Sequence, residues 1–215
     1  MSFDGAPPKK GMGTGAKVLI ILGILAGVAA LACCGGIGYF GYQMKPVITT
    51  TASEVTERTG TIAEMEINQE KFEPKMHMSM SIPMVMDMSI AKWDSKLDDG
   101  GLLLTKILMK IEDPNQNQDD VDRQMEQAFS QGGGNQDGQP QMAPLVGTST
   151  PETLTFLGEE CEFTYTEGKR QGSDDEYKEL KGHGKRGKEI VVVRIQAKAE
   201  NFDKQAILDM LAQAK

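Results

Sequence analysis

The chain has 215 residues with 31 acidic and 23 basic side chains, which gives a formal net charge of −8 at neutral pH. Beyond residue 45 the imbalance grows to 30 acidic against 19 basic side chains, a net charge of −11. A domain this acidic repels phosphate backbones, so nucleic acid is excluded as a partner. The roughly 170 residues beyond residue 45 suffice for one ordinary domain with a hydrophobic core.

Residues 18–42 contain no charged side chain. As a helix they would extend about 38 Å, enough to cross a hydrocarbon core of about 30 Å. Lys9, Lys10 and Lys17 precede this run, whereas Lys45 and Arg58 are the only nearby basic residues after it, which favours a cytoplasmic N-terminus. The sequence therefore predicts a single-pass inner-membrane protein in contact with the lipid bilayer. Its parts are a disordered cytoplasmic tail (1–17), a transmembrane helix (18–42), a spacer (43–60) and an extracytoplasmic domain (61–215).

Two other targeting segments resemble this run. A cleaved signal peptide has an apolar core of about 7–15 residues, which is shorter than the one present here. A bacterial lipoprotein signal would place a lipidated cysteine after a small residue, as in the sequence Ala30-Leu31-Ala32-Cys33. The uncharged run continues past that cysteine, so a retained signal anchor is favoured, and lipidation of the cysteine is left open.

Small residues recur along one side of the predicted transmembrane helix. Such a stripe lets two helix backbones approach closely and favours a homodimer, although glycine and alanine are also simply common in membrane helices. The predicted dimer face consists of Gly23, Gly27, Ala26, Ala30, Cys34 and Gly38.

The most regular pattern beyond this run extends from Met76 to Ile90, where every even position is apolar. Strict alternation predicts a half-buried strand, or two strands joined at Pro83, because proline cannot donate a hydrogen bond to a strand ladder. A run at 102–111 has apolar side chains on both of its faces, which predicts a strand covered on both sides.

Two amphipathic helices and a strand meander are predicted in the rest of the chain. Residues 117–131 have apolar side chains at helical spacing, and 132–144 form a polar, glycine-rich loop that is predicted to be mobile. A closing helix is predicted to be capped by Asn201. The strands of the meander are predicted at 154–156, 161–166, 175–182 and 189–199.

These elements predict an α+β fold, with an antiparallel sheet flanked by helices on both faces. Their order, the Met/Ile strand pair and the closing segment from Asn201 to Ile207 resemble the α/β/α sandwich of the PsbP-like family, which comprises photosystem II extrinsic proteins and their bacterial relatives. The chain also resembles uncharacterised bacterial proteins with one N-terminal anchor and such a domain. The resemblance implies a binding or accessory role and carries no functional residue.

Candidate metal ligands occur together at Met76, His77, Met78 and Met80. Thioethers and imidazole suit Cu(I) or Ag(I), which predicts a periplasmic metal-handling module as the alternative function. On a strand, however, the three methionines share one face with core residues and the histidine points to the other face. Packing is therefore the favoured interpretation of these methionines, and no metal or cofactor is predicted.

Catalytic motifs are missing from the sequence. It has only two histidines, lacks a GxSxG elbow, and its Cys161 is predicted to be buried beside Phe163, where a thiol is inert. We therefore expect no enzyme. The prediction is a membrane-anchored, non-catalytic domain that acts through protein or small-ligand contacts, with an envelope protein as its partner.

Overall fold

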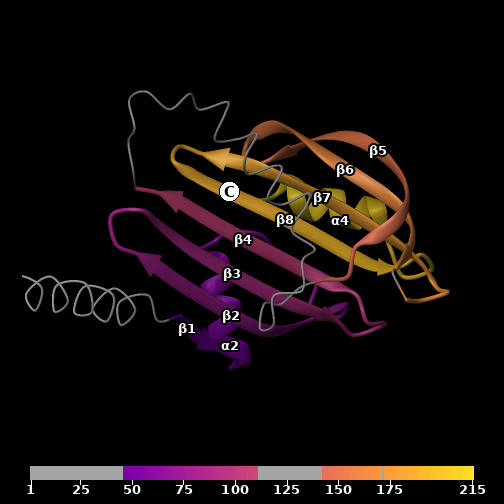
Figure 1. The fold of residues 1–215 in the computed structure, drawn as a ribbon, viewed down its shortest axis with the longest axis horizontal. Helices are drawn as coiled ribbons and strands as arrows, with labels where there is room; N and C mark the ends of the chain where they lie inside the picture. The colour runs from indigo at the N-terminus through magenta and orange to yellow at the C-terminus, as the bar shows by residue number, and fades with distance from the viewer. Residues whose placement is uncertain (1–45, 111–141, 171) are drawn as a thin grey trace, which may run out of the picture. The chain divides into compact units, whose positions relative to one another are not determined.

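The computed structural model describes residues 46–110, 142–170 and 172–215. Contacts divide the chain into two units, 1–44 and 45–215, and the described residues belong to the second. Its strands form one eight-stranded antiparallel sheet in the order β1-β2-β3-β4-β8-β7-β6-β5 (Figure 1). The strands are β1 (Val47–Thr49), β2 (Phe72–Ile82), β3 (Met86–Ser95), β4 (Gly101–Met109), β5 (Leu145–Phe156), β6 (Glu159–Arg170), β7 (Glu176–Arg186) and β8 (Glu189–Lys198).

The alternating run after residue 75 forms a hairpin, which confirms the second of the two predicted alternatives, two strands joined at Pro83. β2 and β3 pair antiparallel up to Ile82 and Met86, and the turn between them contains Met84 at a positive φ of 63°. β4 has buried apolar side chains on both faces, as its sequence predicts. Leu104 lies on one face and Ile107 on the other.

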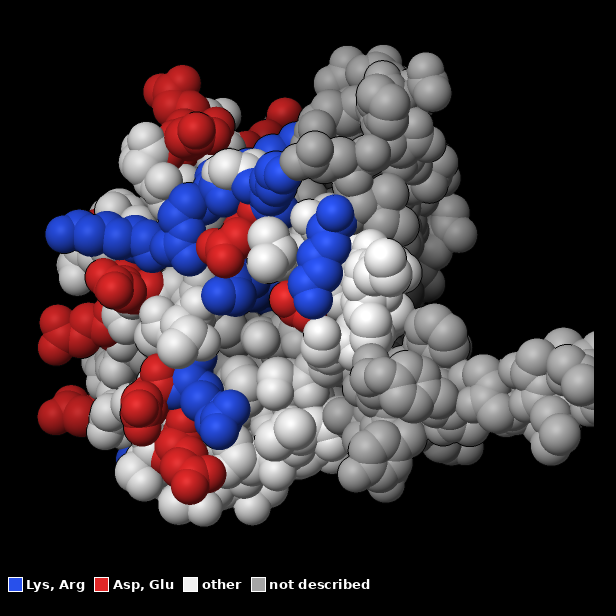
Figure 2. Space-filling view, turned by 90° about the vertical axis from the view of Figure 1, so that its left-hand side faces the viewer, with Lys and Arg blue, Asp and Glu red and all other residues white. Residues whose placement is uncertain are grey.

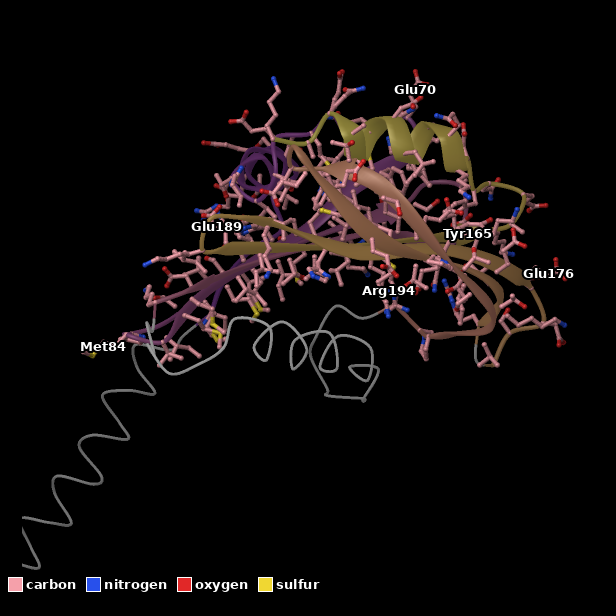
Figure 3. The ribbon with its side chains drawn as sticks, turned by 90° about the horizontal axis from the view of Figure 1, so that it is seen from above. Glu70, Met84, Tyr165, Glu176, Glu189 and Arg194 are labelled. Carbon is pink, nitrogen blue, oxygen red and sulfur yellow. The ribbon has the colours of Figure 1, made fainter. Side chains whose placement is uncertain are left out.

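Two helices of nine residues each, α2 (Ala52–Gly60) and α4 (Lys204–Ala212), lie on the same face of the sheet, here called the helix face (Figure 3). Trp93 of β3 donates a hydrogen bond from Nε1 to Thr59 Oγ1 of α2 at 3.1 Å. The N-cap of α4 is Asp203, whose side chain accepts a hydrogen bond from the backbone N–H of Ala206. The sequence-based choice of Asn201 as the cap is therefore wrong by two residues.

The main hydrophobic core lies between the helix face and the two helices. Its buried side chains come from the central strands, from the segment after α2 and from α4. The largest fully buried apolar members are Trp93, Phe156, Phe163, Ile62, Leu102, Leu104, Leu180, Ile195 and Leu211.

The predicted α/β/α sandwich is wrong for the described part of the chain. Eight strands dominate it, and both of its helices are short and pack on a single face. The strands β2 to β8 are nine to twelve residues long. Tight turns with Gly158 and Gly187 at positive φ join β5 to β6 and β7 to β8. The helix predicted at 117–131 and most of the loop predicted at 132–144 lie outside the described residues.

The prediction of a transmembrane helix and of a single-pass inner-membrane location is also corrected. Across 46–110, 142–170 and 172–215, no helix is long and apolar enough to span a bilayer. A helix of nine residues extends only about 14 Å, less than half of a hydrocarbon core. The segments on which the prediction rested, 1–17 and 18–42 with the proposed dimer face, lie outside the described residues.

The stretch predicted as a spacer contains ordered elements of the domain. β1 pairs with β2 at the edge of the sheet, where Thr49 lies opposite His77. α2 buries Val55 completely and packs along β2 and β3. Residues 47–60 therefore contribute to the same folded body as the sheet.

Candidate functional site

A cavity of about 660 Å³ lies on the helix face between α4, β8 and the segment at 66–72. We call it the α4 groove. Its apolar lining residues are Ile67, Phe72, Ile195, Ala197, Phe202, Ala206, Ile207 and Met210. Its polar lining residues are Glu66, Asn68, Gln69, Glu70, Lys71, Asn201, Asp203, Asp209 and Gln213. A volume in this range is typical of small-molecule sites.

The floor of the α4 groove is reachable from solvent. Phe202 is 9% exposed and Met210 is 8% exposed, whereas Leu180 and Leu211 in the core beside them are 0% exposed. The amphipathic pattern of α4 explains this arrangement, because one stripe of the helix faces the sheet and continues up to the rim. An apolar group that entered the groove would therefore meet apolar side chains without unfolding the core.

Both ends of the groove wall are fastened to the C-terminal segment. At one end Lys71 Nζ lies 3.1 Å from Asp203 Oδ2, at the N-cap of α4. At the other end Glu64 and Lys215 exchange two backbone hydrogen bonds, of 3.1 and 3.2 Å. Between them the Asn68 side chain accepts a hydrogen bond from the backbone N–H of Glu70 at 2.8 Å, which holds the turn. These contacts fix the shape of the groove before any ligand enters.

The rim of the groove is acidic. Four carboxylates, Glu66, Glu70, Asp203 and Asp209, lie on it against one ammonium, that of Lys71. The backbone N–H of Ala206, with a further contribution from Lys71, holds the pKa of Asp203 below its ordinary value. Glu70 stands beside α4 and points outward (Figure 3). The rim therefore favours a cationic or neutral group and disfavours an anionic one.

A second cavity, of about 510 Å³, adjoins the α4 groove. The two share Glu66, Ile67, Gln69 and Gln213 in their linings, so the segment at 64–69 separates them. The second cavity reaches α2 and Trp93, the single tryptophan of the chain. An elongated ligand in the first cavity would thus end close to an intrinsic fluorophore.

The structure does not bring the predicted metal ligands together. Met76, Met78 and Met80 point to the face of the sheet opposite the helices, and His77 points to the helix face. The histidine is 2% exposed, and neither ring nitrogen has a hydrogen-bond partner. Burial, and secondarily Arg58 and Lys106, lowers its pKa below the ordinary value. The sheet therefore separates the histidine from the three methionines, and the four side chains cannot bind one ion together.

Cys161 lies half-buried in β6, and its thiol contacts the backbone oxygen of Phe156 at 3.7 Å. Burial raises the pKa of this thiol, which disfavours the reactive thiolate. In the three described ranges, no three His, Cys, Asp or Glu side chains converge as a metal site. The expectations of no enzyme and no cofactor remain predictions.

A buried polar network occupies the face opposite the helices. Glu179 Oε2 accepts hydrogen bonds from Arg194 Nε at 2.8 Å and from Gln196 Nε2 at 3.0 Å. Arg194 also donates to the backbone oxygens of Met142 and Ala143, at 2.8 and 3.1 Å. Arg194 projects away from α4 (Figure 3). The network holds Met142 and Ala143, which lie just before β5, against the sheet. We therefore interpret it as structural.

The basic residues near the β7–β8 turn are mixed with acidic ones. Arg186 lies 2.7 Å from Glu189, and Lys106 lies 3.6 Å from the same carboxylate. Figure 2 views this end of the domain, where Lys and Arg side chains stand among Asp and Glu. This mixture is typical of a solvated hairpin tip rather than of a patch for phosphate groups.

Sequence reasoning missed the residues of the α4 groove. The segment 66–72 reads EINQEKF, in which polar residues separate two apolar ones, Ile67 and Phe72. That spacing is too irregular to indicate a strand or a helix, and it identifies no ligand. The groove forms only because the C-terminal helix, 130 or so residues later in the chain, packs beside this segment.

Comparison with known protein families finds no model that matches the chain, and comparison with curated proteins finds no match. The resemblance to the PsbP-like family therefore stays a prediction from the sequence.

Proposed function

We propose that this domain is a non-catalytic binding module that takes an elongated amphipathic small molecule in the α4 groove. Its apolar body would lie on the floor formed by α4 and β8, and its neutral or cationic head would lie at the rim. The observation that supports this proposal is a pre-shaped cavity of about 660 Å³ with an apolar floor and an acidic rim. A protein partner from the cell envelope stays a prediction of the sequence.

The apolar floor supplies the attraction for the body of the ligand. Burying apolar surface contributes roughly 25 cal/mol per Å², and the aromatic rings of Phe72 and Phe202 add large flat contact areas. The fastened walls keep the conformational cost of binding low, because little of the site must be ordered when the ligand enters.

The rim determines which head group is accepted. A cationic head near Glu66, Glu70 or Asp209 gains Coulomb energy, whereas an anionic head is repelled by the same carboxylates. Fatty acids and anionic lipids are therefore poor candidates. Alkyl amines, quaternary ammonium compounds and uncharged glycosylated or hydroxylated amphiphiles fit the site.

The test compares two alkyl chains of equal length that differ in head group. Dodecyltrimethylammonium and dodecyl sulfate are titrated into the full chain below their micelle-forming concentrations, with binding measured by calorimetry and folding followed by circular dichroism. We expect the cation to bind about tenfold or more tightly than the sulfate, which requires only about 1.4 kcal/mol of Coulomb energy. Equal affinities, or tighter binding of the sulfate, contradict the proposed head-group preference.

Two alanines of α4 supply a matched pair of variants. Ala206 lines the groove and is exposed, so Ala206→Trp places an indole in the mouth without removing a core contact. Ala212 is exposed on the same helix and does not line the groove. We expect Ala206→Trp to abolish binding of the cation and Ala212→Trp to retain it. Binding that survives Ala206→Trp unchanged refutes the groove as the site.

A further inference from the structure

Four methionines meet on the face of the sheet opposite the helices. Met80 of β2 lies directly across from Met88 of β3, and Met86 of β3 lies directly across from Met109 of β4. The two pairs occupy neighbouring rungs of the ladder, because Met86 and Met88 are two residues apart on one strand. Side chains directly opposite each other have Cβ atoms about 4.5–5.5 Å apart, and diagonal neighbours are about 7–8 Å apart. Met86 and Met88 therefore each neighbour the other three thioethers, whereas Met80 and Met109 lie on either side of β3.

These methionines stand half-buried near the β2–β3 turn. Figure 3 shows sulfur atoms gathered on the side away from α4, close to the turn that carries Met84. The thioethers are thus partly exposed to solvent and lie outside the main core. A small ion could reach them from solvent.

The choice of methionine here is unusual for a strand. β-branched and aromatic side chains are the residues that strands favour, and β8 in the same sheet follows that rule with Ile190, Val192 and Ile195. At Met80, Met86, Met88 and Met109 the three neighbouring strands β2, β3 and β4 instead carry flexible thioethers. Packing alone does not require sulfur at four adjoining positions.

We propose that Met80, Met86, Met88 and Met109 form a thioether site for a soft monovalent cation, with Cu(I) as the natural class of ligand. Thioether sulfur is a soft, uncharged donor that selects Cu(I) and its analogue Ag(I) over hard cations such as Mg²⁺ and Ca²⁺. The unbranched side chain of methionine has enough rotatable bonds to turn several sulfurs toward one ion. The net charge of −8 also favours the approach of a cation.

This site differs from the run of metal ligands that the sequence indicates. His77 takes no part in it, because that side chain lies on the other face of the sheet beneath α2. Three of the four ligands, Met86, Met88 and Met109, come from β3 and β4, which the fold places beside the β2 strand of Met80. The site is also independent of the α4 groove, which lies on the helix face.

The experiment uses Ag(I), which binds thioethers without redox chemistry. The full chain carries Cys33→Ser, Cys34→Ser and Cys161→Ser, because thiolates would capture the ion first. Its methionine methyl groups are labelled with ¹³C and followed by NMR during the titration. We expect one Ag(I) per chain, bound more tightly than by N-acetylmethionine amide, with the largest methyl shifts at the four named methionines. Binding no tighter than that of the free amide overturns the proposal.

A matched pair of double variants locates the ion. Met80→Leu with Met86→Leu removes one thioether from each rung and conserves side-chain volume. Met65→Leu with Met76→Leu removes two thioethers elsewhere in the described domain. We expect the first variant to lose the binding and the second to keep it, with both showing the native circular dichroism spectrum. Binding that is retained by the first variant, or lost in the second, overturns the assignment.

Discussion

The two faces of the sheet carry different kinds of side chain although they share the same strands. On the helix face, Leu104, Val193 and Ile195 are completely buried among aliphatic and aromatic neighbours. On the opposite face of the same central strands lie Gln196, hydrogen-bonded to Glu179, and the methionines of β2 to β4. Adjacent positions of one strand thus serve unrelated purposes.

The helix face contributes mainly to the stability of the fold, whereas the opposite face carries side chains that need specific partners. The helix face excludes water by close packing, and its contribution depends on shape and volume. The opposite face also buries aliphatic side chains such as Ile107, but it adds side chains whose contribution depends on particular partners, either hydrogen-bond donors and acceptors or soft sulfur atoms. Substitutions on the two faces should therefore destabilise the domain by different mechanisms and by different amounts.

Truncation on the helix face should cause the largest loss of stability. Leu104→Ala removes a completely buried side chain and leaves a cavity, so we expect the free energy of unfolding to fall by about 2–5 kcal/mol. Urea denaturation followed by Trp93 fluorescence measures the change. The exposed Leu97 is the control, since Leu97→Ala should alter stability by less than about 0.5 kcal/mol. Equal effects at the two positions would show that Leu104 is not in the core.

Removal of one partner from the polar network should be the next most damaging change. Glu179→Leu leaves Arg194 Nε and Gln196 Nε2 without their shared acceptor, and unsatisfied buried groups cost about 1–3 kcal/mol. The double variant with Arg194→Leu should lose less than the sum of the two single variants, because it removes the unpaired charge as well. Strict additivity in denaturant titrations would contradict the described network.

Acid should weaken the helix face through His77. Its folded-state pKa is lowered by burial and then by Arg58 of α2 and Lys106 of β4. Below about pH 6.5 the unfolded chain binds a proton that the folded chain resists, so stability falls as the pH falls, by at most about 1.4 kcal/mol per pH unit. Denaturation midpoints at several pH values should show this slope in the wild type and lose it in His77→Leu. A slope that persists unchanged in His77→Leu would contradict this prediction.

Conservative change within the methionine cluster should affect stability least. Met88→Leu keeps an apolar side chain of similar volume on the opposite face, so we expect a loss under about 1.5 kcal/mol. The same denaturation assay provides the measurement. A loss as large as that of Leu104→Ala would mean that Met88 is packed as tightly as the helix face, and the contrast between the two faces would disappear.

Short-range patterns predicted much of the sheet correctly. Alternation from Met76 to Ile90 predicted one half-buried strand or two strands joined at Pro83, and the second alternative is correct. The double apolar pattern predicted that β4 is covered on both faces. Such patterns succeed because a strand alternates its side chains between two faces, so burial can be read from neighbouring letters. The same patterns did not predict where each element begins and ends, as the N-cap of α4 shows. The sandwich prediction erred because helix count and helix placement depend on packing that periodicity does not specify.

Composition alone gives the acidic charge, and residues close together in the chain specify the alternation of the strands and the amphipathic stripe of α4. The fold, in contrast, sets which face carries both helices, which strands are neighbours and where Lys71 meets Asp203. The α4 groove and the methionine cluster both join segments far apart in sequence. Such contacts follow from strand register and helix docking, which are set by the whole core at once.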